Sequence, residues 1–396
     1  MRQQNILFVH DDHDNNLFAK ADCGASQRST CMIRALARNG HVDVVSFVDE
    51  TISNLPNVDV VFSGHIDGEL YPEGRKCDDR IAKFLGLFER NPYAFYPENK
   101  QKSAIVESFV ATGDYDLIVV HFFYQACDCG LLKYANRLVI DVDDDPKDKV
   151  LMLQDKVRTW RKRMYHRIYA NRVEKVVKST LGTVYKSFYS SPNNSYPNAV
   201  FLPNISSFTA NKDSIFAPQT HRILVVGLFL YYPNAEGLRH FVSHVFPQVR
   251  KQIADAELDV VGRMDDELKS FCKSVDGVNV RGWVEDLKEA YWNCICVIVP
   301  IYRGAGTCIK LVEAMALGKA VVTTPAGKRG LHPDFHEGID YLSANSDDEF
   351  AKNVIRLLSD EELNRMMGQN ALRKTQLYYS EESFGKVIDS ALFSGK

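Results

Sequence analysis

The amino-acid sequence predicts an α/β protein made of two doubly wound domains, each built around a parallel sheet. The chain has 396 residues, more than one hydrophobic core usually organises. Short, nearly continuous apolar runs alternate with helix-like stretches, a pattern typical of strands buried on both faces of a parallel sheet. This alternation occurs twice, before and after a polar segment at 206–220. Two such domains joined by a linker imply a cleft between them, where ligands usually bind.

The first domain is expected over residues 1–208. Its strands are predicted at the apolar runs 5–10, 42–47, 58–62, 115–121 and 137–141. A helix is predicted over Gln27–Asn39, after a long polar loop that ends at Ser26, and Gly24, Ser26 and Arg28 lie at this junction. Ligands of open α/β sheets bind beyond the carboxyl ends of strands. These three residues therefore either hold a ligand or are a turn glycine and solvated side chains.

Polar side chains stand at the ends of two predicted strands in the first domain. His121 ends one strand, where an imidazole can contact a substrate or transfer a proton, or can be a satisfied core residue. Asp141, Asp143, Asp144 and Asp145 crowd the end of the next strand. Carboxylates this close can bind Mg²⁺ or Mn²⁺, and loop acids before a helix can equally cap it.

A strongly basic segment runs from Lys156 to Lys178. It contains nine Lys and Arg residues and one acid, Glu174, and its apolar residues recur at near-helical spacing. Such an amphipathic helix can lie on an anionic membrane, or it can be a domain helix with a solvated basic face. The candidate membrane residues are Trp160, Arg161, Lys162, Arg163 and Arg167. Nucleic acid is not expected as a partner, because the net charge is only −3 and no known module surrounds the helix.

The second domain is expected over residues 209–378, with a last amphipathic segment at 379–396. Its predicted strands are 222–226, 258–261, 278–280, 295–300 and 320–323, most of which end at or near a glycine. The stretch 302–331 organises this domain. It has a glycine-rich turn followed by a predicted helix at 307–317, which directs backbone N–H groups and a helix N-terminus to one point. That arrangement suits a phosphate.

The chain shows no targeting or membrane-spanning pattern. The first residues lead straight into an apolar run without a charged region and long apolar region before it, so no signal peptide is expected. No apolar run approaches the ~20 residues that span a bilayer. The nine scattered cysteines indicate reduced thiols rather than a disulfide framework. We expect a cytoplasmic protein, peripheral at the inner membrane face if the basic helix meets lipid.

With these pieces in order, the chain resembles the retaining GT-B glycosyltransferases of family 4, the glycosyl transferases group 1. The most specific motif is GAGTCIKLVEAMALGKAVVTT followed by Gly327 and Gly330-Leu331. It is supported by VVGLFLYYPNAEGLRHF, VVGR, RGWVEDL and GASQR at matching places along the chain. The resemblance implies two Rossmann-like doubly wound domains facing each other across a cleft, with the last helix crossing back to the first domain.

The resemblance also implies the reaction. A sugar would pass, with retention, from a UDP- or GDP-linked donor to a sugar or lipid-linked acceptor in cell-surface polysaccharide or glycolipid synthesis, without a metal or cofactor. The residues implied as catalytic are His121, Lys310 and Glu313, and Glu313 would accept hydrogen bonds from the donor's ribose. The implied donor contacts are Gly227, Arg263, Trp283, Val284, Arg303, Gly304, Gly306, Thr307, Cys308, Lys310 and Glu313. Gly24, Ser26 and Arg28 would face the acceptor.

Two departures from the family pattern keep alternatives open. Ala305 replaces the first acid of the family's glutamate pair, which lies near the transferred sugar. The loop Leu228–Tyr232 lacks the Arg and Lys that many members place there, so Arg303 and Lys310 are the candidate cations for the leaving diphosphate. A catalytically weakened nucleotide- or sugar-binding member, and a nucleotide-sugar epimerase on the same fold, are the alternatives.

Overall fold

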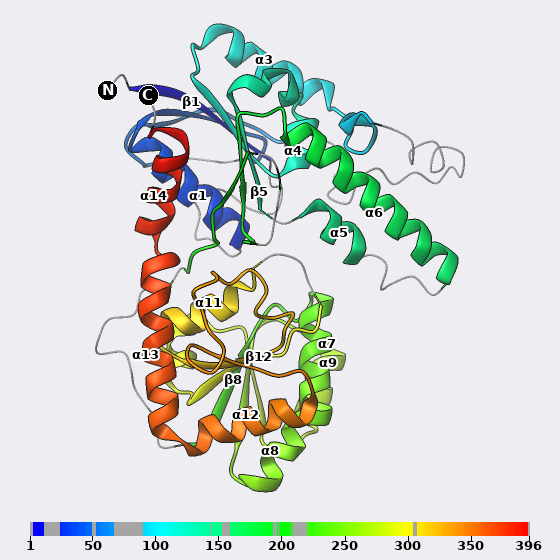
Figure 1. Cartoon of the computed structure of the whole chain (residues 1–396), viewed down its shortest axis with the longest axis vertical. Helices are drawn as coiled ribbons and strands as arrows, with labels where there is room; N and C mark the ends of the chain where they lie inside the picture. The colour runs from blue at the N-terminus through cyan, green and yellow to red at the C-terminus, as the bar shows by residue number, and fades with distance from the viewer. Residues whose placement is uncertain are drawn as a thin grey trace. The chain divides into compact units, whose positions relative to one another are not determined.

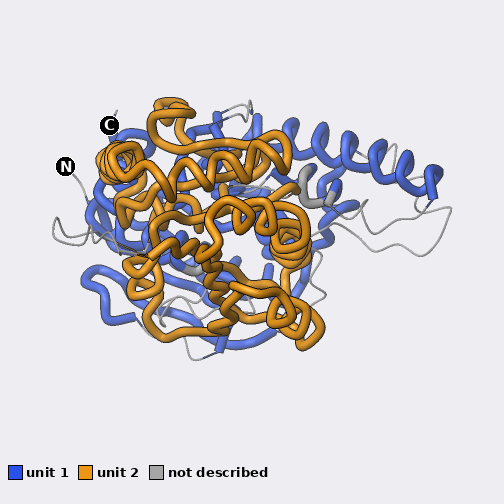
Figure 2. The backbone as a smooth tube through the Cα atoms, turned by 90° about the horizontal axis from the view of Figure 1, so that it is seen from below, with its two compact units in different colours: residues 1–204, 381–396 blue, residues 205–380 orange. Residues whose placement is uncertain are grey.

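The computed structural model divides into two compact units (Figure 2). Unit 1 comprises Met1–Asn204 and Glu381–Lys396, and unit 2 comprises Ile205–Ser380. The residues that the structure describes are 3–11, 24–49, 53–66, 90–143, 145–152, 159–192, 196, 198–206, 208, 220–303 and 307–394. Each unit is an α/β body with a wholly parallel sheet, so the predicted fold class is confirmed at this level.

Unit 1 is built on a seven-stranded sheet in the order β3-β2-β1-β4-β5-β6-β7. Figure 1 labels β1 and β5 of this sheet. The strands are β1 (Gln4–His10), β2 (Gly40–Ser46), β3 (Val58–Ser63), β4 (Leu117–His121), β5 (Leu138–Asp143), β6 (Lys186–Tyr189) and β7 (Ala199–Phe201). All five residues of β4 are buried, as expected for a central strand covered on both faces. Strands β6 and β7 were not predicted, because they are only four and three residues long.

Most of the helices of unit 1 lie between successive strands of the chain. They are α1 (Gly24–Ala37), η1 (Pro92–Ala94), α3 (Lys100–Thr112), α4 (Phe123–Asp128), η2 (Leu131–Arg137), α5 (Pro146–Met152), α6 (Trp160–Leu181) and α14 (Glu381–Leu392). Helix α14, the last of the chain, packs against α1. The amide of Asn39, just beyond α1, donates to Asp389 Oδ1 of α14 at 2.7 Å. The C-terminal segment is thus part of the same body as the first residues of the chain.

Unit 2 has a six-stranded sheet in the order β10-β9-β8-β11-β12-β13. Its strands are β8 (Arg222–Val226), β9 (Glu257–Val261), β10 (Val278–Gly282), β11 (Cys296–Val299), β12 (Ala320–Thr323) and β13 (Leu342–Ser343). Its helices are α7 (Tyr232–His240), η5 (Phe241–Val245), α8 (Phe246–Gln252), α9 (Asp266–Lys273), α10 (Leu287–Trp292), α11 (Ile309–Ala316), α12 (Asp347–Ser359) and α13 (Glu361–Tyr378). The predicted strands are confirmed, with ends that differ by a few residues.

Both sheets have the same kind of switch point. In unit 1 the chain leaves β1 for β2 and β3, and then returns to place β4 on the other side of β1. In unit 2 it leaves β8 for β9 and β10, and then places β11 beside β8. Two loops that start from adjacent strands diverge at such a point, and ligands of doubly wound sheets bind there, beyond the carboxyl ends of the strands. Ligand sites are therefore expected beyond the carboxyl ends of β1 and β4 in unit 1, and of β8 and β11 in unit 2.

Candidate functional site

The switch point of unit 2 brings together Gly227, Asn234 and Lys310. Gly227 directly follows β8, Asn234 lies in the first turn of α7, and Lys310 lies in the first turn of α11. The Lys310 ammonium donates to Asn234 Oδ1 at 2.6 Å, and the Asn234 amide donates to Leu228 O at 2.8 Å. A Cβ atom added to Gly227 would lie 3.3 Å from Lys310 Nζ. The glycine thus leaves the space beside the ammonium open.

The charge of Lys310 is placed to act on a ligand. Its hydrogen-bond partner among the described residues, Asn234, is a neutral amide. Burial lowers the pKa of Lys310, and the negative charge of Glu313, one turn further along α11, acts in the opposite direction. A partly desolvated ammonium that lacks a bound carboxylate gains most from an anionic ligand, since the ligand would replace the water it has lost.

The N-terminus of α11 adds to this preference for an anion. Its N-cap residue, Cys308, makes no side-chain cap hydrogen bond, and the first turn has no acid. By contrast, the N-cap residues of α9, α12 and α13 are Asp265, Ser346 and Asp360, and their side chains accept cap hydrogen bonds. Each of these helices also has acids in its first turn. Uncapped amides and the positive end of the helix dipole therefore stand beside Lys310, a combination that suits a phosphate.

The loop after β12 closes against the residue that precedes this helix. Gly330 has a φ of +83°, and a Cβ atom there would lie 2.4 Å from Thr307 Oγ1. Only glycine combines that backbone conformation with such a close approach. Gly330, one of the glycines that the motif places after the strand, therefore shapes the turn that carries Thr307. Residues 304–306, which include the predicted Gly304 and Gly306 and the departure at Ala305, lie outside the described residues.

The other predicted donor residues lie along the same edge of the sheet. Arg263 is exposed and follows β9, and Trp283, 63% exposed, and Val284 follow β10. Arg303 follows β11, with its Nη2 3.2 Å from Glu236 Oε1. Glu313 is half-buried on α11. Their roles stay predictions.

Sequence reasoning missed Asn234 at this site. Its position in the first turn of the helix after β8 was the available signal.

In unit 1, Arg28 is buried and bound to the protein itself. Its exposed fraction is 2%. Its Nε and Nη2 atoms each donate to one carboxylate oxygen of Asp141 at 2.7 Å, and Nη1 donates to Leu202 O at 2.9 Å and to Asn204 Oδ1 at 2.8 Å. This bidentate pair joins α1 to the end of β5. Contact with an acceptor was predicted for Arg28 from the sequence, and the structure adds a structural role for its guanidinium.

His121 lies next to this ion pair at the switch point of unit 1. Its Nδ1 is 2.7 Å from Ser29 Oγ, and its ring stacks on Phe122, whose φ is +67°. Its Nε2 has no hydrogen-bond partner among the described residues, and it lies 3.7 Å from Asp141 Oδ2 and 3.9 Å from Asp143 Oδ2. The sequence left two interpretations of His121, a core residue with satisfied hydrogen bonds or a residue that acts on a substrate. The first interpretation holds for Nδ1, which is bound to Ser29. It does not hold for Nε2, which faces the two carboxylates without a hydrogen bond. Gly24 and Ser26 belong to the first turn of α1.

The described acids at the end of β5 and in the loop after it are bound by other residues of the protein. Asp141 is bound to Arg28, as described above. Asp145 Oδ1 accepts from the backbone N–H of Lys147 at the start of α5, and Asp145 Oδ2 accepts from Tyr196 Oη at 2.5 Å. The helix-capping interpretation is therefore confirmed for Asp145, while Asp144 lies outside the described residues.

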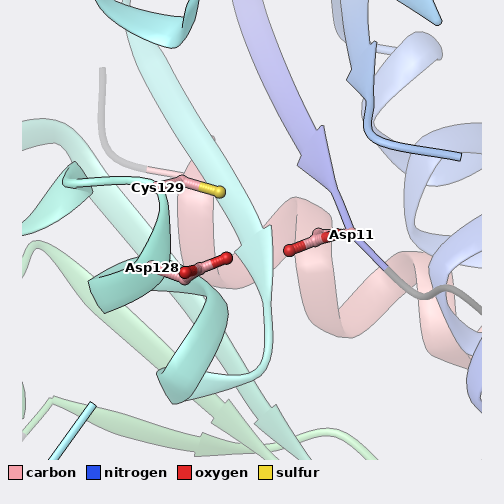
Figure 3. Close-up of side chains that lie close together, drawn as sticks. All are labelled: Asp11, Asp128 and Cys129. Atoms are coloured by element: carbon pink, nitrogen blue, oxygen red, sulfur yellow. The ribbon is translucent and has the colours of Figure 1, made fainter. Parts of the chain in front are cut away.

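A second buried charge cluster follows β1. Asp11, Asp128 and Cys129 place one potential metal-ligand atom each within 4.8 Å of one another (Figure 3). Lys102 Nζ, however, lies 2.7 Å from Asp11 Oδ2 and 2.8 Å from Asp128 Oδ2. An ammonium in that place would repel a metal cation, so these residues fit an internal ion cluster better than a metal site. The cluster ties the end of β1 to α3 and α4.

Comparison with known proteins bears on unit 2 first. Residues 220–360 match the family model "Glycosyl transferases group 1". The match covers most of unit 2, from β8 to the end of α12. An uncharacterized 44.6 kDa protein in the cps region of Klebsiella pneumoniae is 31% identical over 142 residues, which are 34% of this chain and 36% of that relative. The similarity in sequence thus spans about a third of each protein.

Solved structures extend the likeness to the whole fold. Sucrose-phosphate synthase of Thermosynechococcus elongatus matches with a TM-score of 0.68 and 16% identity, over 100% of both chains. Anabaena HepE in complex with UDP-glucose matches with a TM-score of 0.63 and 13% identity, over 99% of this chain and 100% of that one. The GT-B fold with two Rossmann-like domains is therefore confirmed. The retaining stereochemistry and the narrower assignment to family 4 stay predictions.

Substitution of Arg28 tests its structural role. Arg28→Met would leave Asp141 buried without its partner, so we expect a loss of about 3–5 kcal/mol in unfolding free energy. Arg34→Met on the same helix is the matched control, because Arg34 pairs with Glu381 at an exposed position and its loss should cost under about 1 kcal/mol. Urea unfolding followed by circular dichroism measures both. Equal small losses would contradict the role given to Arg28.

The cluster around Asp128 predicts a pH dependence. Burial raises the pKa of Asp128 from 3.8 to about 6, against the opposing effect of Lys102. Because the folded protein holds this proton more tightly than the unfolded chain, its stability should fall as pH rises through that interval. Asp128→Asn removes the titration, so the Tm of the variant minus that of the wild type should increase from pH 4 to pH 7. A difference that does not change with pH would refute the assignment.

Proposed function

We propose that the protein is a glycosyltransferase that moves a sugar, with retention of configuration, from a nucleotide-sugar donor to a sugar or lipid-linked acceptor. The observation that supports this most is the meeting of Lys310, Asn234 and the uncapped start of α11 at the switch point of unit 2. Residues 220–360 of that unit match the family model of the glycosyl transferases group 1. The similar Anabaena structure was solved with UDP-glucose, which favours a UDP-linked donor, and a GDP-linked donor is the alternative.

The proposed chemistry matches the charges at this edge of the sheet. Negative charge builds on the departing diphosphate as the bond to the sugar breaks. A fixed cation and backbone N–H groups at that point lower the barrier, because they need no reorganisation when the charge appears. Lys310 and the first amides of α11 would stabilise the diphosphate, with Arg303 as a second cation. Glu313 would accept hydrogen bonds from the ribose of the donor.

Unit 1 would supply the side that faces the acceptor. His121 has a ring orientation held by Ser29 and Phe122, and we propose that it lies near the reacting sugar. The phosphate of the donor would take the proton of the acceptor hydroxyl. The name of the Klebsiella relative mentions the cps region, which favours a role in cell-surface polysaccharide or glycolipid synthesis. We propose that the protein works in the cytoplasm, at the inner membrane face.

We further propose that transfer needs no metal. Groups of three possible metal ligands within the described residues are Asp11, Asp128 and Cys129, and His41, Asp43 and Asp59. The first surrounds the Lys102 ammonium, and the second lies at the amino-terminal ends of β2 and β3, the opposite edge from the switch point. Lys310 and Arg303 would do the electrostatic work that a metal does in other transferases.

Ala305 favours one further candidate. Without the first acid of the glutamate pair, the site would hold the donor sugar less firmly, so a nucleotide- or sugar-binding protein with weak transfer is the second proposal. An epimerase on the same fold is a third.

A panel of donors separates these functions. Purified full-length protein would be incubated with UDP-, GDP- and ADP-sugars, with and without EDTA. We expect steady release of UDP or GDP that EDTA leaves unchanged. Binding seen by thermal shift without nucleotide release would support the pure binder, and donor conversion without release would support the epimerase. Loss of release in EDTA would overturn the metal-free proposal.

Lys310→Ala tests the cation at the site. We expect kcat/KM for the donor to fall by about 10²–10³-fold, the usual effect of removing one group that stabilises developing charge. Lys273→Ala, an exposed lysine of α9, is the control and should leave kcat/KM within about twofold. A similar small effect for both variants would show that Lys310 does not stabilise the leaving group.

A further inference from the structure

Helix α6 has two halves with different surroundings. The second half is anchored by a buried face made of Ala170, Val173, Val176, Val177 and Leu181. The first half, from Trp160 to Tyr169, has no buried residue. Figure 1 shows α6 as one long helix with α5 beside it, and the two helices pack together within unit 1. The helix is therefore anchored along its second half, and its first half reaches the core at its last residue, Tyr169, whose ring packs against Phe95.

The open half carries an exposed apolar stripe. Trp160, Met164 and Ile168 are 68%, 52% and 46% exposed. They are spaced by four residues, so they lie one above the other on one side of the helix, opposite the buried face of its second half. Large side chains exposed in a row rather than singly mark a surface that binds something. A helix face that contacts only water would not be expected to carry three large apolar side chains in one row.

Cations flank this stripe, and the helix itself has no acid among them. Arg161, Lys162, Arg163 and Arg167 are all exposed, and no Asp or Glu occurs in α6 before Glu174. Glu174 itself is bound by Lys147 at 2.6 Å and Lys178 at 2.8 Å. The positive charge around the stripe is thus not neutralised by the acid of the helix. A partner that fits must offer an apolar layer beside a negatively charged one.

We propose that the first half of α6 docks on an anionic lipid surface, with Trp160, Met164 and Ile168 inserted at the interface and the four cations against the lipid head groups. Trp and basic residues are the types that favour the head-group region of a bilayer. No helix among the described residues is long and apolar enough to cross a membrane, so the proposed attachment is along the surface. The proposal deepens the proposed function, since a lipid-linked acceptor lies in the same surface.

The charge pattern argues against two other partners. A second copy of the same helix would bring its four cations against these four and be repelled. The phosphates of a nucleic acid would bind the cations, but they would leave the contiguous apolar stripe of the helix without an apolar surface to contact. Both remain outcomes of the test below.

Cosedimentation with vesicles tests the cationic part. Full-length protein should pellet with vesicles of phosphatidylcholine and phosphatidylglycerol at low salt, and should not pellet with phosphatidylcholine alone. Changing the four cations of α6 together to Gln should lower the partition coefficient by at least about a hundredfold, since each cation contributes about fivefold near an anionic surface. The matched control changes four exposed cations elsewhere, Lys251, Lys273, Arg365 and Arg373, to Gln, and should retain binding.

Apolar substitutions test the stripe. Met164→Ser with Ile168→Ser should lower binding about tenfold. Met366→Ser with Leu377→Ser removes similarly exposed side chains from α13 and should not change it. The chain has three tryptophans, and the fluorescence of the wild type should shift to the blue with anionic vesicles, a shift that Trp160→Phe should remove.

The proposal fails if wild-type protein does not pellet with anionic vesicles, or if the α6 variants bind as the controls do. It also fails if single-stranded RNA competes fully at equal phosphate concentration, or if sedimentation shows a dimer that the α6 substitutions abolish. None of these measurements needs a donor or an acceptor. If the protein binds vesicles but releases no nucleotide, the proposed sugar transfer is contradicted and the proposed membrane-binding surface is not.

Discussion

The parallel arrangement of both sheets is the constraint on which the rest of the structure depends. Because neighbouring strands are parallel, each connection must return to the opposite edge of the sheet before the chain can pair again, so the loops at the carboxyl edge all follow strands that point the same way. Because the first strand of each unit lies inside its sheet, two such loops diverge beside it. Gly227 and Lys310 meet at one of these places, and His121 and Arg28 lie at the other. The strand order alone therefore sets where the two sites lie, and the side chains decide what each site can bind.

The buried cations differ in how they are neutralised, and this difference separates structural from ligand-facing charge. Arg28 is bound to both oxygens of Asp141, and Lys102 to both Asp11 and Asp128. Each of these charges is compensated inside the protein, and removing one partner would leave an uncompensated charge. Lys310 instead donates to the neutral amide of Asn234. No carboxylate among the described residues is bound to it, and the start of α11, which has no side-chain cap, favours an anionic ligand.

Helix α6 shows a similar division along a single element. Its second half contributes apolar side chains to the core of unit 1, and its first half exposes a stripe of the same chemical type. Both stripes have helical spacing, so periodicity in the sequence cannot tell one from the other. The basic residues between them give the segment its charge, but only exposure shows which apolar residues are available to a partner.

The sequence by itself determined the fold class, most of the strands and the place of the glycine-rich motif in unit 2. These depend on hydrophobic periodicity and turn residues, which are local properties of the chain. Tertiary structure decided which charges are free to act, since the partners of Arg28 and Lys310 lie 113 and 76 residues away in the chain. It also decided that Asn234 lies beside Lys310 and that Trp160, Met164 and Ile168 face outward. Pairing between distant residues and burial arise only when the elements pack, so no local pattern encodes them.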